Sequence, residues 1–170
     1  MNKRTIKILL LLAILIFCTS CDLSTKWLAK QRLEYARPVT IIENFVELRY
    51  TENEAIAFSM LHSLESGLRK WLIYSLSLVA MIFLTVLTWQ VRHQSLWWLV
   101  SLTLIFSGAL GNLLERLARG YVIDFIHLHY YDRFSWPVFN AADIFITCGA
   151  ILLGILTFRQ SPESTLITDN

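Results

Sequence analysis

The sequence predicts an all-α membrane protein with four transmembrane helices and a small extracytoplasmic β-sheet. Of its 170 residues, 55% are hydrophobic, which is more apolar surface than the core of a soluble domain of this length can bury. The apolar residues gather in four stretches, most of them close to the roughly 20 residues that cross a bilayer core. Tryptophans lie mainly at the ends of these stretches, where their rings favour the interface between lipid and water. We therefore expect a single membrane-embedded domain over residues 1–170.

The basic residues predict how the chain is oriented. The expected spans cover residues 6–21, 71–90, 97–114 and 138–158. Basic residues precede the first span, lie between the second and third, and follow the fourth: Lys3, Arg4, Lys7, Arg92 and Arg159. The positive-inside rule then predicts cytoplasmic termini and two outer segments, residues 22–70 and 115–137. The outer segments hold basic residues as well, so the N-terminal cluster is the strongest cue. A net charge of only +2 gives no indication of nucleic-acid binding.

The N-terminal segment also permits a second interpretation, a secretory signal peptide. Ser20 and Cys21 resemble the end of a lipoprotein cleavage site, which would make the chain a substrate of lipoprotein processing. However, Cys18 stands where a leucine is expected, and three later spans make a lipid anchor redundant. Cys18 and Cys21 form a C-x-x-C pair, but within an apolar helix we interpret both as core residues. With Cys148 as the third cysteine, no disulfide framework is indicated.

The first outer segment begins as a continuation of the first span. Asp22 and Lys26 are four residues apart, so on a helix they share one face and can pair. This pair is either an interfacial ion pair or a support for a catalytic site. Pro38 then breaks any helix.

Extended structure is expected in both outer segments. Residues 46–50 alternate between apolar and charged, the period of a strand with one buried face, and we expect a small β-structure over residues 39–62 on the outer membrane surface. Val122–Tyr130, rich in β-branched and aromatic residues, is a second extended piece that could pair with the first.

A polar block ends the third span. Gly108 and Asn112 lie on one helix face, where a neighbouring helix can approach closely, and we interpret Gly108 as a packing residue. Asn112 can form a hydrogen bond with another helix or with a substrate backbone. Arg116, one turn further, can reach the interface or pair with an acid.

Two acids near the ends of apolar stretches predict the chemistry. Asp124 follows the third span, and Asp143 lies in the opening turn of the fourth. An ionised carboxylate in a membrane costs several kcal/mol, so such residues are rare there. Asn140 is a suitable N-cap, and taken alone Asp143 is explained by capping, which is worth about 0.3–1 kcal/mol. Because Asp124 and the cluster of Asn112 and Arg116 lie at the same predicted depth as Asp143, a joint catalytic role becomes the better interpretation.

Two close carboxylates share a proton, since both cannot easily ionise. The ionised acid can take a proton from water while the protonated acid polarises a scissile carbonyl. We therefore predict peptide hydrolysis at Asp124 and Asp143 without a nucleophilic side chain. The helix dipole favours Asp143 as the more readily ionised partner.

Other functions remain open at this point. His127 and His129 lie on one face of the expected strand and, with Asp124, could hold zinc, although no further ligand pattern supports a metal site and none is predicted. Asp143 could instead be the relay of a proton-coupled transporter, but we find no internal repeat. The chain could also be a non-catalytic assembly factor. No G-x-S-x-G motif supports a serine nucleophile.

Taken together, these blocks resemble the lipoprotein signal peptidases (signal peptidase II), bacterial intramembrane aspartic peptidases. The resemblance covers nearly the whole chain and depends on the order and spacing of five short motifs. They are Asp22-x-x-Thr-Lys26, Asn53-x-x-x-Ala-Phe58, Gly108-Ala-Leu-Gly-Asn112-Leu-x-x-Arg116, Gly120-x-Val-x-Asp124-Phe and Phe139-Asn140-x-Ala-Asp143.

The resemblance implies that Asp124 and Asp143 are the catalytic dyad. It implies binding or supporting roles for a further set: Asp22, Lys26, Asn53, Gly108, Asn112, Arg116 and Asn140. It further implies cleavage of prolipoproteins just before a diacylglyceryl-modified cysteine, at the outer face of the bacterial cytoplasmic (inner) membrane. No metal or organic cofactor is implied, and globomycin-type cyclic peptides would inhibit the enzyme. One bundle can hold the whole site, so we expect a monomer in contact with membrane lipid.

Two residues depart from the family pattern. Ala55 stands where glycine is usual, and Glu115 stands where aspartate is common. Both changes leave the dyad intact, so they bear on substrate preference and not on the reaction.

Overall fold

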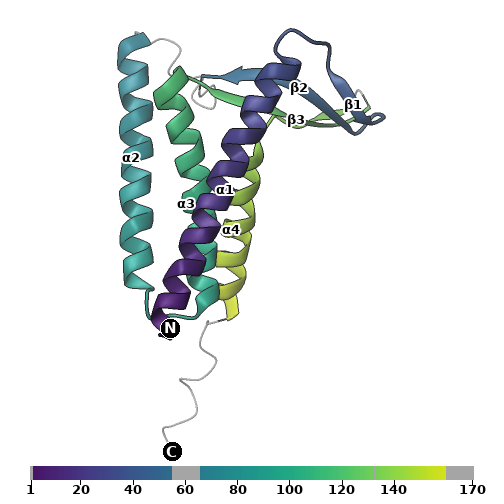
Figure 1. Ribbon diagram of the computed structural model, residues 1–170. Helices are drawn as coiled ribbons and strands as arrows, with labels where there is room; N and C mark the ends of the chain where they lie inside the picture. Colours follow the sequence, from purple (N-terminus) through teal and green to yellow (C-terminus); the bar gives the residue numbers. More distant parts are fainter. Residues whose placement is uncertain (1, 55–65, 132, 160–170) are drawn as a thin grey trace, which may run out of the picture.

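Four helices form a bundle with a small antiparallel sheet at one end (Figure 1). The computed structural model describes residues 2–54, 66–131 and 133–159. The helices are α1 (Lys3–Leu33), α2 (Ser66–Gln90), α3 (Leu96–Arg119) and α4 (Ala141–Arg159). Each contains a stretch long and apolar enough to cross a membrane. The predicted fold class, four apolar helices with a small sheet, is confirmed.

Helix α3 is the centre of the bundle, since it packs against α4, α1 and α2. Glycines make the α3–α4 contact close: a Cβ atom on Gly108 would collide with the backbone carbonyl of Ala142, and one on Gly149 with that of Ser101. The predicted packing role of Gly108 therefore agrees with its surroundings. Helix α2 stands at one side of the bundle and packs mainly against α3 (Figure 1).

Two helices are longer than the apolar stretches that predicted them. Helix α1 continues from the expected end at residue 21 to Leu33, because Asp22 and Lys26 are buried in polar contacts and Ala29 and Leu33 pack beneath the sheet. Helix α3 continues from residue 114 to Arg119. Gly120 ends it, with a positive φ of 87° and an N–H donated to the Arg116 carbonyl.

The sheet joins the two outer segments. Its strands are β1 (Val39–Ile42), β2 (Val46–Asn53), β3 (Val122–Tyr130) and β4 (Phe134–Ser135), in that spatial order. The predicted pairing of the two extended pieces is confirmed, since β2 and β3 are antiparallel and Thr51 lies opposite Asp124. The part of the expected β-structure from residue 55 onward, including Ala55, lies outside the described residues. The N-terminus and the end of α4 lie at the end of the bundle opposite the sheet (Figure 1).

Candidate active site

A buried polar network lies where α1, α3, α4 and β3 meet beneath the sheet. Asp22, Lys26 and Asn140 are fully buried, and Asn112 and Asp124 are almost so. Buried polar groups are costly unless they are hydrogen-bonded, so a concentration of them marks either a structural lock or a reaction site.

Asn140 joins the two predicted catalytic acids. Its side-chain Nδ2 donates to Asp124 Oδ1 at 2.6 Å, and its Oδ1 accepts from the Asp143 backbone N–H at 3.1 Å. Its own backbone N–H donates to Asp143 Oδ2 at 3.1 Å. This reciprocal pair is a capping box, so the prediction that Asn140 caps the last helix is confirmed. The cap fixes Asp143 at the start of α4, while the side chain of Asn140 also donates a hydrogen bond to Asp124.

Asn112 links Asp143 to the buried side chain of Lys26. Its Nδ2 donates to Asp143 Oδ1 at 3.1 Å, and its Oδ1 accepts from Lys26 Nζ at 2.6 Å and from Asn140 Nδ2 at 3.3 Å. Both ends of the amide are therefore used, which fixes its orientation.

Lys26 is the positive centre of the network. Its Nζ lies 2.8 Å from Asp22 Oδ2 and 3.3 Å from Glu115 Oε2. The predicted pairing of Asp22 with Lys26 is confirmed, but the pair is buried and does not lie at an exposed interface. Asp22 Oδ1 also accepts from the Ala142 backbone N–H at 2.9 Å, in the first turn of α4. Gly111 leaves the space for Asp22, because a Cβ atom there would overlap its Oδ2.

Asp124 lies at the sheet side of the network. Its Oδ2 accepts from Asn53 Nδ2 on β2 at 2.8 Å. Burial raises the pKa of Asp124 to about 6, because desolvation penalises the charged carboxylate. The hydrogen bond from Asn53 opposes this rise, and the negative charge of Asp143 adds to it. Near neutral pH this acid can thus be converted readily between its protonated and ionised forms.

Arg116 lies close enough to Asp124 and Asp143 for electrostatic attraction. Its Nε is buried and has no hydrogen-bond partner among the described residues. A buried guanidinium nitrogen without a partner is costly, and it is available to an oxygen atom brought by a ligand.

Sequence reasoning treated Glu115 only as a departure from a family pattern. In the structure its Oε2 accepts from the Ile123 backbone N–H at 3.0 Å as well as facing Lys26, and its Oε1 lies 3.5 Å from Arg119 Nε. It therefore fixes the start of β3, one residue before Asp124. No local sequence signal indicates this role, because the partners of Glu115 lie on α1 and β3.

The histidine pair does not join this site. His127 Nδ1 lies 2.8 Å from Glu47 Oε1 and its Nε2 lies 2.8 Å from Ser135 Oγ, while its ring stacks on that of His129. Glu47 and the two histidines have polar atoms within 4.8 Å of one another. Asp124 does not belong to this group, and its carboxylate accepts hydrogen bonds from Asn53 and Asn140.

The chain is similar to known proteins over most of its length. The family model described as signal peptidase (SPase) II matches residues 13–159. A lipoprotein signal peptidase of Rhodococcus jostii is 40% identical over 165 residues, covering 92% of this chain and 77% of the relative. One from Acinetobacter baumannii is 39% identical over 150 residues, covering 85% and 82%. A solved bacterial membrane enzyme, 25% identical, superposes with a TM-score of 0.74 and covers 89% of this chain and 94% of its own.

Proposed function

The chain belongs to the signal peptidase II family, and on this premise we propose that Asp124 and Asp143 are the catalytic acids with which it removes signal peptides from prolipoproteins. It is a multi-pass bacterial membrane protein and an aspartic peptidase. The observation that carries the assignment of the two acids is Asn140, which binds both of them at once.

The reaction needs one acid to accept a proton and one to donate. Each oxygen of both acids accepts an N–H hydrogen bond, so these bonds do not distinguish the two roles. Asp143 lies in the first turn of α4, where the positive end of the helix dipole favours a negative charge. Asp124, with its pKa raised to about 6, is suited to keep a proton. Asp143 then takes a proton from water, whose oxygen attacks the scissile carbonyl carbon, while Asp124 donates its proton to the carbonyl oxygen. When the C–N bond breaks, the leaving nitrogen takes the proton from Asp143. One hydroxyl of the tetrahedral intermediate returns its proton to Asp124 as the C=O bond re-forms, which restores both acids to their starting states.

The substrate is a prolipoprotein whose cysteine already carries diacylglycerol, cleaved just before that cysteine. Its acyl chains would stay in the bilayer, so the scissile bond would lie near the lipid boundary where the spans end. Arg116 is a candidate donor to the substrate backbone, since its buried Nε lacks a partner among the described residues. Asn112 and Asn140 orient the acids. Lys26, paired with Asp22, donates a hydrogen bond that holds Asn112 in place.

The active site faces the outer side of the cytoplasmic membrane, and both termini are cytoplasmic. Support comes from Lys3, Arg4 and Lys7 at the start of α1, at the bundle end opposite the sheet (Figure 1). Because one chain contributes the whole network, we infer that a monomer is active. Globomycin-type cyclic peptides are expected to inhibit it.

The test is cleavage of a diacylglyceryl-modified precursor by the purified chain, beside its unlipidated twin. Asp124→Asn and Asp143→Asn should each lower the cleavage rate by at least about 10²-fold, the usual contribution of a general acid or base. Glu52→Gln, an exposed acid on β2, is the matched control and should cleave normally. If either aspartate variant cleaves the precursor at the wild-type rate, the proposal is wrong.

A chelator separates this mechanism from metal catalysis. Two aspartates need no metal ion to activate water, so EDTA should leave the cleavage rate unchanged. Loss of activity in EDTA, with recovery on adding zinc, would favour the metal-dependent alternative.

A further inference from the structure

A large pocket lies at the bundle end opposite the active site. It has a volume of about 860 Å³ and is lined by α1, α2, α3 and the short link between α2 and α3. This volume falls in the upper part of the roughly 300–1,000 Å³ range of small-molecule pockets. It is separate from the Asp124–Asp143 network, because none of that network's residues lines it.

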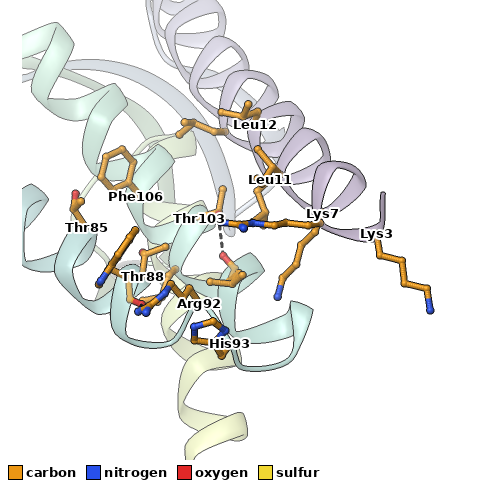
Figure 2. A pocket seen from close by; sticks show the side chains of 16 residues that line it. Lys3, Lys7, Leu11, Leu12, Thr85, Thr88, Arg92, His93, Thr103 and Phe106 are labelled. Atoms are coloured by element: carbon orange, nitrogen blue, oxygen red, sulfur yellow. Dashed lines mark hydrogen bonds between the residues drawn. The ribbon is translucent and has the colours of Figure 1, made fainter. Parts of the chain in front are cut away.

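The walls and the rim of this pocket differ in chemistry. In Figure 2, Leu12 and Phe106 lie in the upper part of the view and Arg92 and His93 lie below them, while Lys3 stands apart at the right with its side chain directed away. The hydroxyls that line the walls are already used within their own helices: Thr88 donates to Leu84 O at 2.7 Å and Thr103 to Leu99 O at 2.7 Å. The interior therefore offers an apolar surface.

The rim carries positive charge that no acidic side chain among the described lining residues neutralises. Its cations are Lys3, Arg4, Lys7 and Arg92. No acidic side chain lines the pocket within the described residues, and the first turn of α1 holds none. Lys7 Nζ donates to the Gln94 carbonyl at 3.2 Å and Arg92 Nη1 to the Trp89 carbonyl at 2.7 Å, but a carbonyl does not cancel a charge. Cations at a helix N-terminus also oppose the helix dipole, so an anion from outside would relieve both effects.

We propose that this pocket binds one anionic glycerophospholipid, with its phosphate at the basic rim and an acyl chain along the apolar walls. A signal peptide fits less well, because its own basic N-terminal region would meet the rim with like charge. The inference goes beyond the peptidase reaction. It draws on the cytoplasmic position proposed for this end, where anionic lipids are concentrated, although binding can be measured without it.

The experiment is native mass spectrometry of the full chain in detergent micelles, with equimolar phosphatidylglycerol and phosphatidylcholine. We expect phosphatidylglycerol to be retained about tenfold more than phosphatidylcholine. Arg4→Gln combined with Arg92→Gln should remove that preference. Thr88→Phe, which fills the pocket without changing charge, should reduce retention of both lipids. Arg159→Gln is the matched control, since Arg159 ends α4 at the same end of the bundle but does not line the pocket.

Several results would overturn the proposal. Equal retention of the two lipids, or a preference that survives both the charge variant and the filled pocket, excludes a specific site. Displacement of the lipid by glycerol phosphate, which has no acyl chains, would indicate a simple anion site. Competitive displacement by an unlipidated signal peptide would make the peptide the occupant.

Cleavage of the lipidated precursor checks that each variant is folded, because these residues lie away from the acids. It also keeps the two proposals apart. Wild-type protein that retains phosphatidylglycerol but does not cleave would contradict the proposed function alone.

Discussion

The two ends of the bundle use the same helices for opposite purposes. At the sheet end, α1 and α3 bring Asp22, Lys26 and Asn112 into direct contact with the start of α4, with side chains buried and hydrogen-bonded to one another. At the other end, the same two helices line an apolar pocket together with α2, and cations lie at its rim. A reaction site in a membrane needs fixed polar groups, whereas a lipid needs an apolar space with a charged edge.

The difference arises from small residues on α3. Gly108 and Gly111 allow α4 and Asp22 to come close at the sheet end. At the other end, Leu99, Leu102 and Phe106 occupy the pocket wall. Close packing therefore brings buried polar side chains together at the sheet end, and variants of the two ends should differ sharply in their cost.

Lys26→Met should have the largest effect on stability. It leaves Asp22 buried without its cation and Glu115 with Arg119 alone, and breaking a buried ion pair in this way costs about 3–5 kcal/mol. The measurement is the midpoint of unfolding of the purified protein in detergent. Lys30→Met is the matched control one helical turn away. Lys30 lies 3.6 Å from Glu34 and donates to the Tyr121 hydroxyl in a partly exposed position, so its loss should cost much less. Equal losses in the two variants would contradict a special role for the buried network.

Gly111→Ala should have the next largest effect. The added Cβ would overlap Asp22 Oδ2, and forcing a group into a packed site costs about 1–3 kcal/mol. Displacement of Asp22 should also disturb Lys26 and so reduce cleavage. The control is Gly154→Ala in α4, where a Cβ meets no atom within 4 Å and helix propensity favours alanine. A variant at residue 111 as stable and active as the control would show that the close contact is not needed.

Local features could be predicted from the sequence, and long-range ones could not. Helical spacing predicted the Asp22–Lys26 pair, and cap chemistry predicted the role of Asn140, because each involves residues within one turn. The contact of Lys26 with Asn112 spans 86 residues and depends on how the helices pack, which periodicity does not specify. The same is true of Glu115, whose partners lie on α1 and β3.

The smallest predicted effect concerns the pKa of Asp124, which the hydrogen bond from Asn53 on β2 lowers. Cleavage that needs protonated Asp124 should fall as the pH rises through about 6, the raised pKa of this buried acid. Since the folded state holds a proton that the unfolded state has lost above its ordinary pKa of 3.8, this acid also makes the free energy of unfolding decrease with rising pH between these values.

Asn53→Ala removes a hydrogen bond that favours the ionised form, so the pKa of Asp124 should rise further and the fall in cleavage should move to higher pH. A shift of roughly one unit corresponds to a hydrogen bond to a charged group worth about 1.5 kcal/mol. The measurement is the pH dependence of kcat/KM, which reports the free enzyme. Glu52→Gln, whose side chain projects from the opposite face of β2, should leave the profile in place. A profile unchanged by Asn53→Ala, or displaced to lower pH, would mean that the falling limb belongs to a group other than Asp124.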